Sequence, residues 1–340
     1  MRRDARAVGR LVFGIGLSLT LAQSASAWGL QGHYMISTAA TKALPDSLPA
    51  FVRSDAAVAE IGALGPELDR SKGAGEPHDL DLDPNHYVDF DDNAKVGGVD
   101  LDALPGSRRD YDTALRKEGG NEYSLGSLPY ALEDGWEQVR VDFAMWRVDR
   151  VGETKAATAP DRAWFATARA LREILTLRDI GVWSHYVGDA SQPLHTTIHF
   201  NGWGKYPNPG GYSDARDLHS RFESTFVRAH ATLADVSAHM RPYKTCACTI
   251  QRHIAQYLHA TLSQVIPLYE IDKRGGFASG SPEAVDFVRA RLGDGATMLR
   301  DLIVDAWEES ANVKVGYPRG ITPKEAEAGS AVPTRSLYGD

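Results

Sequence analysis

Apolar residues along most of the chain recur every three or four positions, which is the period of a helix that buries one face. A first run ends before Pro45, because proline cannot continue a helix without losing a hydrogen bond. Asp161 is the predicted N-cap of a long helix that continues to Tyr186. The pattern predicts helices over residues 33–44, 49–69, 128–147, 161–186, 217–230, 250–269 and 282–309.

Signals for β-strands are scarce, and the chain contains no internal repeat. Only residues 86–90 alternate between apolar and polar positions as a short strand does. Residues 71–84 and 91–109 are rich in Gly, Asp and Pro and are predicted to be loops. This balance predicts an all-α fold, a single domain of packed, partly kinked helices around a polar cleft that binds metal.

The first 27 residues have the three parts of a secretory signal peptide. Four arginines precede an apolar run at 11–22, which is too short to span a bilayer, and small residues lead up to Ala27. We therefore predict cleavage after Ala27, a mature chain that begins at Trp28, and a secreted or periplasmic location. No later segment is apolar for long enough to form an integral membrane helix.

The chain divides into three parts on this basis. Residues 1–27 are the predicted signal peptide, residues 28–315 the main domain, and residues 316–340 a polar tail that is either a surface strap or disordered. We assume a monomer, since nothing in the sequence indicates the oligomeric state. The only cysteines, Cys246 and Cys248, form either a local disulfide or two free thiols, so zinc ligands must be His, Asp or Glu.

The charge balance excludes binding of polyanions by a broad basic surface. The chain carries 37 basic and 45 acidic residues, a net charge of −8, and loss of the leader with four arginines and one aspartate makes it −11. Proteins that bind nucleic acid or anionic lipid by surface charge alone are usually rich in Lys and Arg. A polyanionic substrate must therefore be attracted locally, and bound cations can do this.

Residues 185–195 contain three side chains that can bind a metal ion. His185 and Asp189 lie four residues apart and therefore share one face of a helix. Pro193 ends that helix and is expected to turn His195 back toward the same site. The segment thus predicts the centre of a zinc site.

The spacing of a histidine and a carboxylate four residues apart recurs at His219 and Glu223. The full set of candidate ligands is Trp28, His33, Asp69, His86, His185, Asp189, His195, His219 and Glu223. Nine ligands exceed what one tetrahedral zinc ion uses. With one shared carboxylate and several waters, they suit three zinc ions.

These nine positions, in this order, resemble the superfamily of zinc-dependent phospholipases C and single-strand-specific nucleases of the S-one/P-one type. The resemblance covers most of the chain from Trp28 to about Val227. It implies an all-α fold around a trinuclear zinc cleft and hydrolysis of phosphodiester bonds. The implied ligand groups are Asp69, His86, His185 and Asp189 for one ion, His195, His219 and Glu223 for a second, and the amino group and carbonyl of Trp28 with His33 and the shared Asp189 for a third.

Zinc suits this reaction because it lowers the pKa of a bound water toward neutrality and stabilises charge on phosphoryl oxygens and the leaving group. Asp69 is the candidate general base, because its second carboxylate oxygen can accept the proton of that water. Lys72 is a candidate phosphate clamp, although a lysine in a glycine-rich loop is more often an ordinary surface residue.

Two substrate classes remain open, single-stranded nucleic acid and phospholipid head groups. Trp203, Tyr206 and Tyr212 lie in one loop, where they could stack bases, cover a choline-like cation or touch a membrane. The N-terminal spacing resembles the nucleases, whereas Glu223, where those nucleases carry Asp, resembles phospholipase C. We favour a single-strand-preferring endonuclease slightly. A zinc-binding protein without catalysis is the alternative outside this class, and a zinc peptidase is disfavoured because the chain has no His-Glu-x-x-His helix.

Overall fold

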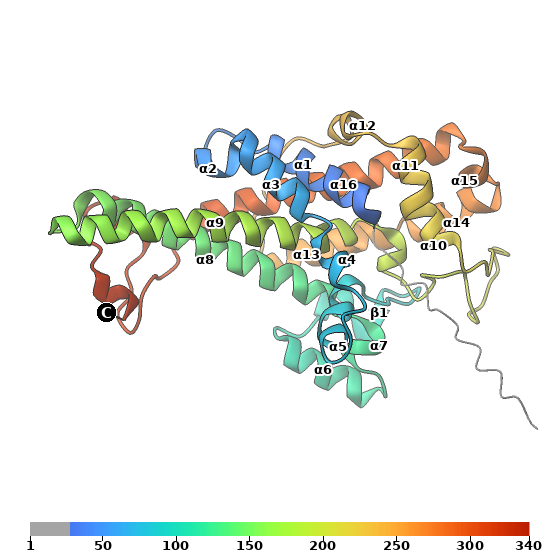
Figure 1. Ribbon diagram of the computed structural model, residues 1–340. Coiled ribbons are helices and arrows are strands. Elements are labelled where there is room, and N and C mark those ends of the chain that lie inside the picture. The colour runs from blue at the N-terminus through green and yellow to red at the C-terminus, as the bar shows by residue number, and fades with distance from the viewer. Residues whose placement is uncertain (1–27, 340) are drawn as a thin grey trace, which may run out of the picture.

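The computed structural model describes residues 28–339, which fold into helices and one two-stranded hairpin. Three long helices run along the molecule in Figure 1: α8 (Leu128–Lys155), α9 (Ala159–Asp189) and α16 (Pro282–Ser310). Beside them lie α1 (Gly29–Lys42) and α3 (Asp55–Leu64). The prediction of an all-α fold is confirmed, whereas the predicted signal peptide lies outside the described residues.

Shorter elements connect these helices. The α-helices among them are α2 (Ala50–Arg53), α4 (Glu67–Ser71), α5 (His78–Leu82), α6 (Arg108–Lys117), α7 (Glu122–Leu125), α10 (Leu218–Ser220), α11 (Val227–His230), α12 (Leu233–Ala238), α13 (Ile250–Leu262), α14 (Val265–Lys273), α15 (Gly276–Ser279) and α17 (Pro323–Glu327). The 3₁₀ turns are η1 (Asp83–His86), η2 (Leu101–Ala103), η3 (Pro193–His195) and η5 (Arg335–Tyr338), and η4 (Arg221–Phe226) is a π-helical turn. Strands β1 (Lys95–Val96) and β2 (Val99–Asp100) pair antiparallel.

Two local predictions are wrong. Residues 86–90 form no strand, because they have no partner strand beyond one isolated bridge between Val88 and Gly126. Asp161 is not the N-cap of α9, because Thr158 occupies that position and its side chain accepts a hydrogen bond from the Asp161 N–H. A threonine three residues ahead of an acidic residue caps a helix in the same way that Asp161 was expected to.

Both predicted loops contain regular structure. Helix α5 lies within residues 71–84, and the hairpin and the start of α6 lie within residues 91–109. Ser107 caps α6, and Tyr111 and Leu115 are its buried residues. Such short elements depend on a few buried side chains. Because the flanking residues are rich in Gly and Asp, the sequence of these segments has the composition of a loop.

Two glycines allow α8 and α9 to pack closely. A Cβ atom at Gly135 would overlap the ring of Trp183, and one at Gly152 would overlap the ring of Phe165. Trp183 Nε1 also donates a hydrogen bond to the carbonyl of Leu132 at 3.1 Å. Close packing of this kind leaves few voids and fixes α9 along α8. The C-terminal end of α9, which carries the predicted central ligands, is therefore held on a rigid support.

The C-terminal tail forms a surface strap across α8 and α9, so the disordered alternative does not hold. Leu337 and Tyr338 of the tail pack against the buried Ala144 and Val148 of α8 and Val315. Near the chain end, the ring of Tyr338 lies 5.4 Å from the ring of Trp164, and the Tyr338 hydroxyl donates to Asp149 Oδ1 at 2.7 Å.

Cys246 and Cys248 form a local disulfide, which is the first of the two alternatives given for them above.

Asp149 makes the stability of the fold depend on pH. Burial raises the pKa of Asp149 from 3.8 to about 6. Because the folded-state pKa is the higher one, the associated stability is complete below the unfolded pKa and is lost as the pH rises through about 6. Asp149→Asn keeps an acceptor for Tyr338 and cannot ionise. We expect this variant to exceed the wild-type free energy of unfolding by about 2 kcal/mol near pH 8 and to match it near pH 4.

Urea titrations of both proteins at these two pH values check this expectation. Tyr338→Phe is the matched control, because it removes the hydrogen bond and leaves the carboxyl group in place. A gain in Asp149→Asn that is larger near pH 4 than near pH 8 would contradict the raised pKa.

Candidate metal centre

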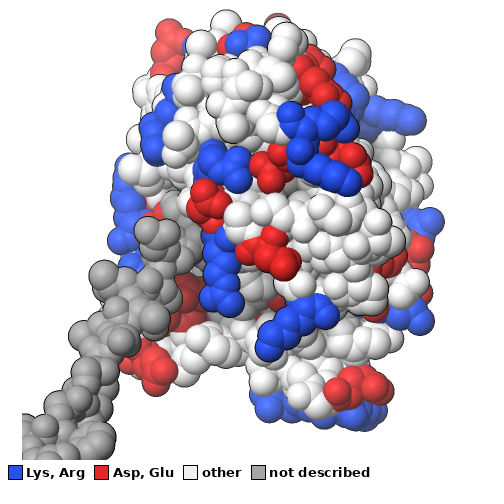
Figure 2. All heavy atoms as spheres, turned by 90° about the vertical axis from the view of Figure 1, so that its right-hand side faces the viewer, with Lys and Arg blue, Asp and Glu red and all other residues white. Residues whose placement is uncertain are grey.

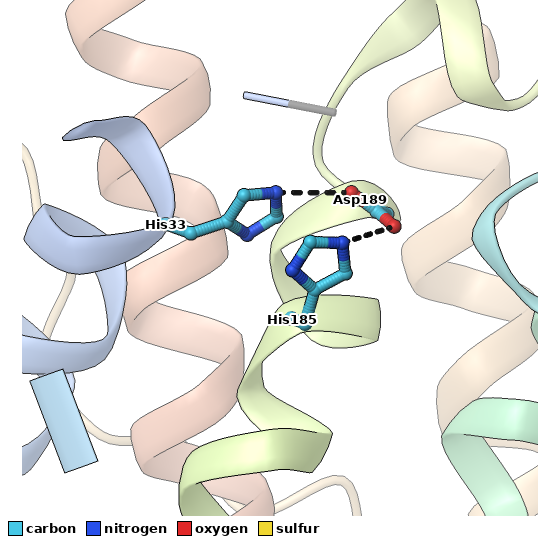
Figure 3. Close-up of side chains that lie close together, drawn as sticks. All are labelled: His33, His185 and Asp189. Carbon is cyan, nitrogen blue, oxygen red and sulfur yellow. Dashed lines mark ion pairs between the residues drawn. The ribbon is translucent and has the colours of Figure 1, made fainter. Parts of the chain in front are cut away.

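The C-terminal end of α9 carries the two central side chains of the site, His185 and Asp189. They lie one helical turn apart, with His185 Nε2 at 3.5 Å from Asp189 Oδ2 (Figure 3). His33 reaches the same carboxylate from α1 and places its Nε2 at 3.3 Å from Asp189 Oδ1. All three side chains are fully buried. The two oxygens of Asp189 therefore face two different histidines.

Asp69 and His86 form a second group around His185. His86 Nδ1 lies 3.1 Å from Asp189 Oδ2 and 3.1 Å from His185 Nε2. Asp69 Oδ1 lies 3.6 Å from His185 Nε2. Asp69 comes from α4 and His86 ends η1, so the chain between them folds back to bring both to α9. The structure thus brings together all four ligands predicted for the first ion.

His195, His219 and Glu223 form the third group. Glu223 Oε2 lies 2.8 Å from His219 Nε2 and 3.7 Å from His195 Nε2. His195 ends the 3₁₀ turn that follows Pro193, as the break in the sequence predicts. His219 lies on α10 and Glu223 on the π-helical turn η4, a rare helix form that is frequent at functional sites. His195 Nδ1 also lies 3.9 Å from Asp189 Oδ1, which links this group to the first two.

Three of these histidines are oriented by backbone carbonyls. The Nδ1 atoms of His185, His195 and His219 lie 2.8, 2.6 and 2.9 Å from the carbonyl oxygens of Gly65, His86 and Phe200, respectively. Because a carbonyl oxygen only accepts, each Nδ1 must carry the proton and donate it. Each Nε2 then turns an unprotonated lone pair toward the acidic residues. Metal-binding histidines are held in this way in most known sites.

Several buried polar atoms of the cluster make no hydrogen bond within the described residues. These atoms are both ring nitrogens of His33, Asp189 Oδ1, His195 Nε2 and Glu223 Oε1. Burial of such atoms is costly unless they bond to something, and a bound cation satisfies nitrogen and carboxylate lone pairs together. The donor set is imidazole and carboxylate, which zinc and similar divalent ions accept. The residues therefore fit metal ions at three groups: His33, His185 and Asp189; Asp69, His86 and His185; His195, His219 and Glu223.

The charges of the cluster keep its carboxylates ionised. Burial alone would raise the pKa of Asp189, but His185 and His195 outweigh it and hold the pKa well below its usual range. The pKa of Glu223 is lowered despite burial, chiefly by His219. Burial, followed by the neighbouring His33, keeps the pKa of His185 well below its ordinary value. Ionised carboxylates and a neutral His185 are the protonation states that bind metal, whereas for His195 burial is outweighed by Asp189 and Glu223, which raise its pKa, so a metal ion must displace its proton.

Trp28 lies beside this cluster and is completely buried. Its indole Nε1 donates to the carbonyl of Gly188 at 2.9 Å and to Ser191 Oγ at 2.8 Å. These contacts hold Trp28 against the turn that follows α9. Its carbonyl accepts the N–H of Gly32 at 3.1 Å and keeps a second lone pair. The role of the Trp28 amino group as a ligand stays a prediction.

Lys72 is tied to the cluster and is not an ordinary surface residue. Its Nζ lies 2.7 Å from Asp69 Oδ1, and its side chain is 13% exposed. The ion pair spans residues three apart at the end of α4. A positive charge is therefore held next to Asp69, the candidate base.

The three aromatic residues of the loop after His199 have different environments. Trp203 is buried, with its ring stacked at 3.8 Å on His199 and 4.5 Å from the ring of Tyr212. The ring of Trp203 therefore supports the loop from within and offers no free face in this conformation. Tyr206 is 44% exposed, and the hydroxyl of Tyr212 donates to Glu270. Substrate binding by this loop stays a prediction, and Tyr206 is the member best placed for it.

Three residues near the centre have no counterpart in the sequence-based predictions. The amide of Gln192 lies 3.1 Å from His219 Nε2 and 3.2 Å from Glu223 Oε2. Asp89 is a carboxylic acid whose pKa burial raises to about 8. The side chain of Phe200 is exposed, and the carbonyl oxygen of Phe200 accepts the hydrogen bond from His219 Nδ1. Only Gln192 had a sequence signal, because it precedes the proline that ends the helix.

Comparison of the chain with protein-family models, with curated proteins and with solved structures finds no match. Within residues 28–339, no helix is both long and apolar enough to cross a membrane.

Proposed function

We propose that this chain is an exported zinc-dependent phosphodiesterase that holds three zinc ions with the nine predicted ligands. The observation that carries the proposal is the arrangement of three buried His and carboxylate groups around Asp189, with lone pairs turned inward. Zinc is the proposed ion because imidazole and carboxylate are both zinc ligands and because the resembling superfamily uses zinc. The resemblance of the nine positions to phospholipases C and single-strand-specific nucleases supports a phosphodiester as the substrate.

Bound zinc ions would supply an activated water and would stabilise the negative charge that develops on the phosphoryl and leaving oxygens. The chain contributes the rest of the chemistry. Asp69 would accept the proton of the attacking water, since its carboxylate lies 3.6 Å from His185 and its side chain is 5% exposed where that of His185 is fully buried. Lys72 offers a positive charge to the phosphate, because it lies within 2.7 Å of Asp69. The carbonyls of Gly65, His86 and Phe200 hold the imidazole rings in place.

Asp69→Asn is expected to lower turnover by on the order of 100-fold while most of the bound zinc remains. The reason is that His86, His185 and Asp189 still surround the first position, whereas the amide cannot accept the proton. Turnover of a generic phosphodiester and zinc per chain are measured on the same samples. Asp46→Asn, at an almost fully exposed carboxylate, is the control and should change neither. Equal losses of zinc and of rate would make Asp69 a ligand without a role as base.

Single-stranded nucleic acid is the substrate we favour. Acidic and basic side chains alternate on the end of the molecule shown in Figure 2, so substrate attraction there depends on local charge. Tyr206 and Phe200 are 44% and 43% exposed. The backbone carbonyl of Phe200 accepts a hydrogen bond from His219 Nδ1, so Phe200 lies next to the third group. Exposed aromatic rings beside a phosphate site suit stacking of unpaired bases.

Phospholipid is the second candidate, because the same exposed rings can also enter a lipid surface or cover a choline-like cation. Rates on single-stranded DNA, RNA and phosphatidylcholine, measured side by side, decide between the two. Turnover of phosphatidylcholine with inert nucleic acids would replace the nuclease proposal. Three bound zinc ions without turnover of any phosphodiester would favour a non-catalytic zinc-binding protein.

A further inference from the structure

Gln192 points its side-chain amide at the third group, His195, His219 and Glu223. It lies in the turn that follows α9 and is completely buried. Its amide nitrogen lies 3.1 Å from His219 Nε2 and 3.2 Å from Glu223 Oε2. Both partners are among the residues proposed to bind zinc, so Gln192 contacts candidate ligand atoms directly.

The backbone of Leu194 fixes which end of this amide faces the third group. The N–H of Leu194 donates to Gln192 Oε1 at 2.6 Å. A backbone N–H can only donate, so its partner must be the amide oxygen, and the NH2 end must face His219 and Glu223. The N–H of Gln192 itself donates to the carbonyl of Asp189 at 2.9 Å, which ties the turn to the end of α9. Rotation of the amide would cost the bond from Leu194, so a hydrogen-bond donor is held at the third group.

Zinc binding would leave one of the two amide hydrogens without its partner. His219 donates through Nδ1 to the carbonyl of Phe200, so its lone pair is on Nε2. A zinc ion at this group would use that lone pair, and the hydrogen that Gln192 gives to His219 would lose its acceptor. The second hydrogen can stay with Glu223 Oε2. Because a buried N–H without an acceptor is unfavourable, the loaded site offers a donor to an oxygen atom that binds beside it.

We infer that Gln192 is a further catalytic residue, whose freed N–H donates to an oxygen of the substrate phosphate at the third group. This inference rests on the proposed function, since it requires zinc at this group and a phosphodiester as substrate. The donor is in place before the substrate arrives, because Leu194 holds the amide. Fixed donors aimed at oxygens that gain negative charge are a strong source of catalysis. An oxygen in the place of this NH2 group would instead be a further zinc ligand, and it would close a site that must stay open to substrate.

Gln192→Glu separates this role from support of the fold. The substitution keeps the shape and keeps an oxygen for the N–H of Leu194, but it places a second oxygen where the NH2 group was. That oxygen can bind zinc and repels phosphate. We expect the affinity for the third zinc ion, measured by competition with a chelator, to rise by on the order of 10-fold. Turnover of a generic phosphodiester should fall by on the order of 100-fold. A variant that only disturbs packing would lose both.

Gln192→Met tests the hydrogen bond to phosphate without added charge. Methionine has a similar length and no N–H, so three zinc ions should remain, whereas inorganic phosphate should bind the zinc-loaded protein on the order of 10-fold more weakly. Calorimetric titration with inorganic phosphate measures this affinity, and circular dichroism shows whether the helices remain. The control is Gln264→Glu, the same change as Gln192→Glu at a glutamine whose amide donates to Ser263 Oγ in an exposed contact, and it should alter none of these quantities.

The wild-type protein separates failure of this inference from failure of the proposed function. Equal losses of zinc affinity and turnover in Gln192→Glu, or a near-normal rate, would overturn the role of Gln192. Wild-type affinity for inorganic phosphate in Gln192→Met would overturn it as well. In each case a wild type with three zinc ions and phosphodiester turnover keeps the proposed function. A wild type without zinc or without turnover overturns the proposed function and this inference together.

Discussion

Asp189→Asn is expected to reduce phosphodiesterase activity more than replacement of any other ligand, by on the order of 1000-fold. Asp189 belongs to one of the three groups and also approaches a histidine of each of the other two. Its oxygens lie 3.3 Å from His33, 3.1 Å from His86, 3.5 Å from His185 and 3.9 Å from His195. Asparagine keeps the shape but offers one neutral oxygen. The two ions that the carboxylate is proposed to bind would therefore lose its negative charge, and one of them would lose a ligand atom.

Zinc content should fall together with the rate in this variant. The measurement is zinc per chain and turnover of a generic phosphodiester, with circular dichroism to show that the helices remain. Asp217→Asn is the matched control, because this carboxylate lies two residues from His219 but is 67% exposed and pairs with Arg221 at the surface. If Asp189→Asn retained three zinc ions and a near-normal rate, the assignment of Asp189 as the shared ligand would be wrong.

A few additional residues ahead of Trp28 are expected to have the second largest effect. A free α-amino group has a pKa of roughly 7.7 to 8.0, so it can lose its proton to a metal ion. A peptide nitrogen cannot, because its lone pair is delocalised into the amide. Trp28 is fully buried, and its indole Nε1 donates to the carbonyl of Gly188, the residue before Asp189. The extended protein should therefore fold but lack one zinc ion and most of its activity.

Two purified forms test this expectation, one that starts at Trp28 and one with the extension. A protease that removes the extension from the second form should restore both zinc and rate, which makes each sample its own control. Three zinc ions and full activity before cleavage would remove the Trp28 amino group from the mechanism. If the extended form gains zinc and activity only after cleavage, removal of the signal peptide during export would also activate the protein.

The closeness of the central candidate ligands was predictable because it depends on local helical periodicity. His185 and Asp189 needed only a four-residue spacing, and His195 needed only a proline between it and the helix. The all-α fold followed from the same periodicity in the long helices. The distances between α1, η1 and α9 did not follow, because they depend on packing between segments that are far apart in the sequence.

Features that depend on tertiary contacts escaped prediction. The π-helical turn at residues 221–226 places Glu223, yet its sequence has the pattern of an ordinary helix. Trp203 has the sequence of an exposed loop aromatic, but His199 and Tyr212 bury it. Lys72 has the context of a surface lysine, and only its distance to Asp69 links it to the site.

The most direct test of the central claim is a titration of metal-free protein with zinc while hydrolysis of a generic phosphodiester is followed. The three groups of ligands predict that the rate rises with added zinc and becomes constant at three ions per chain. A protein that binds zinc at these groups and hydrolyses no phosphodiester at any ratio would contradict the claim.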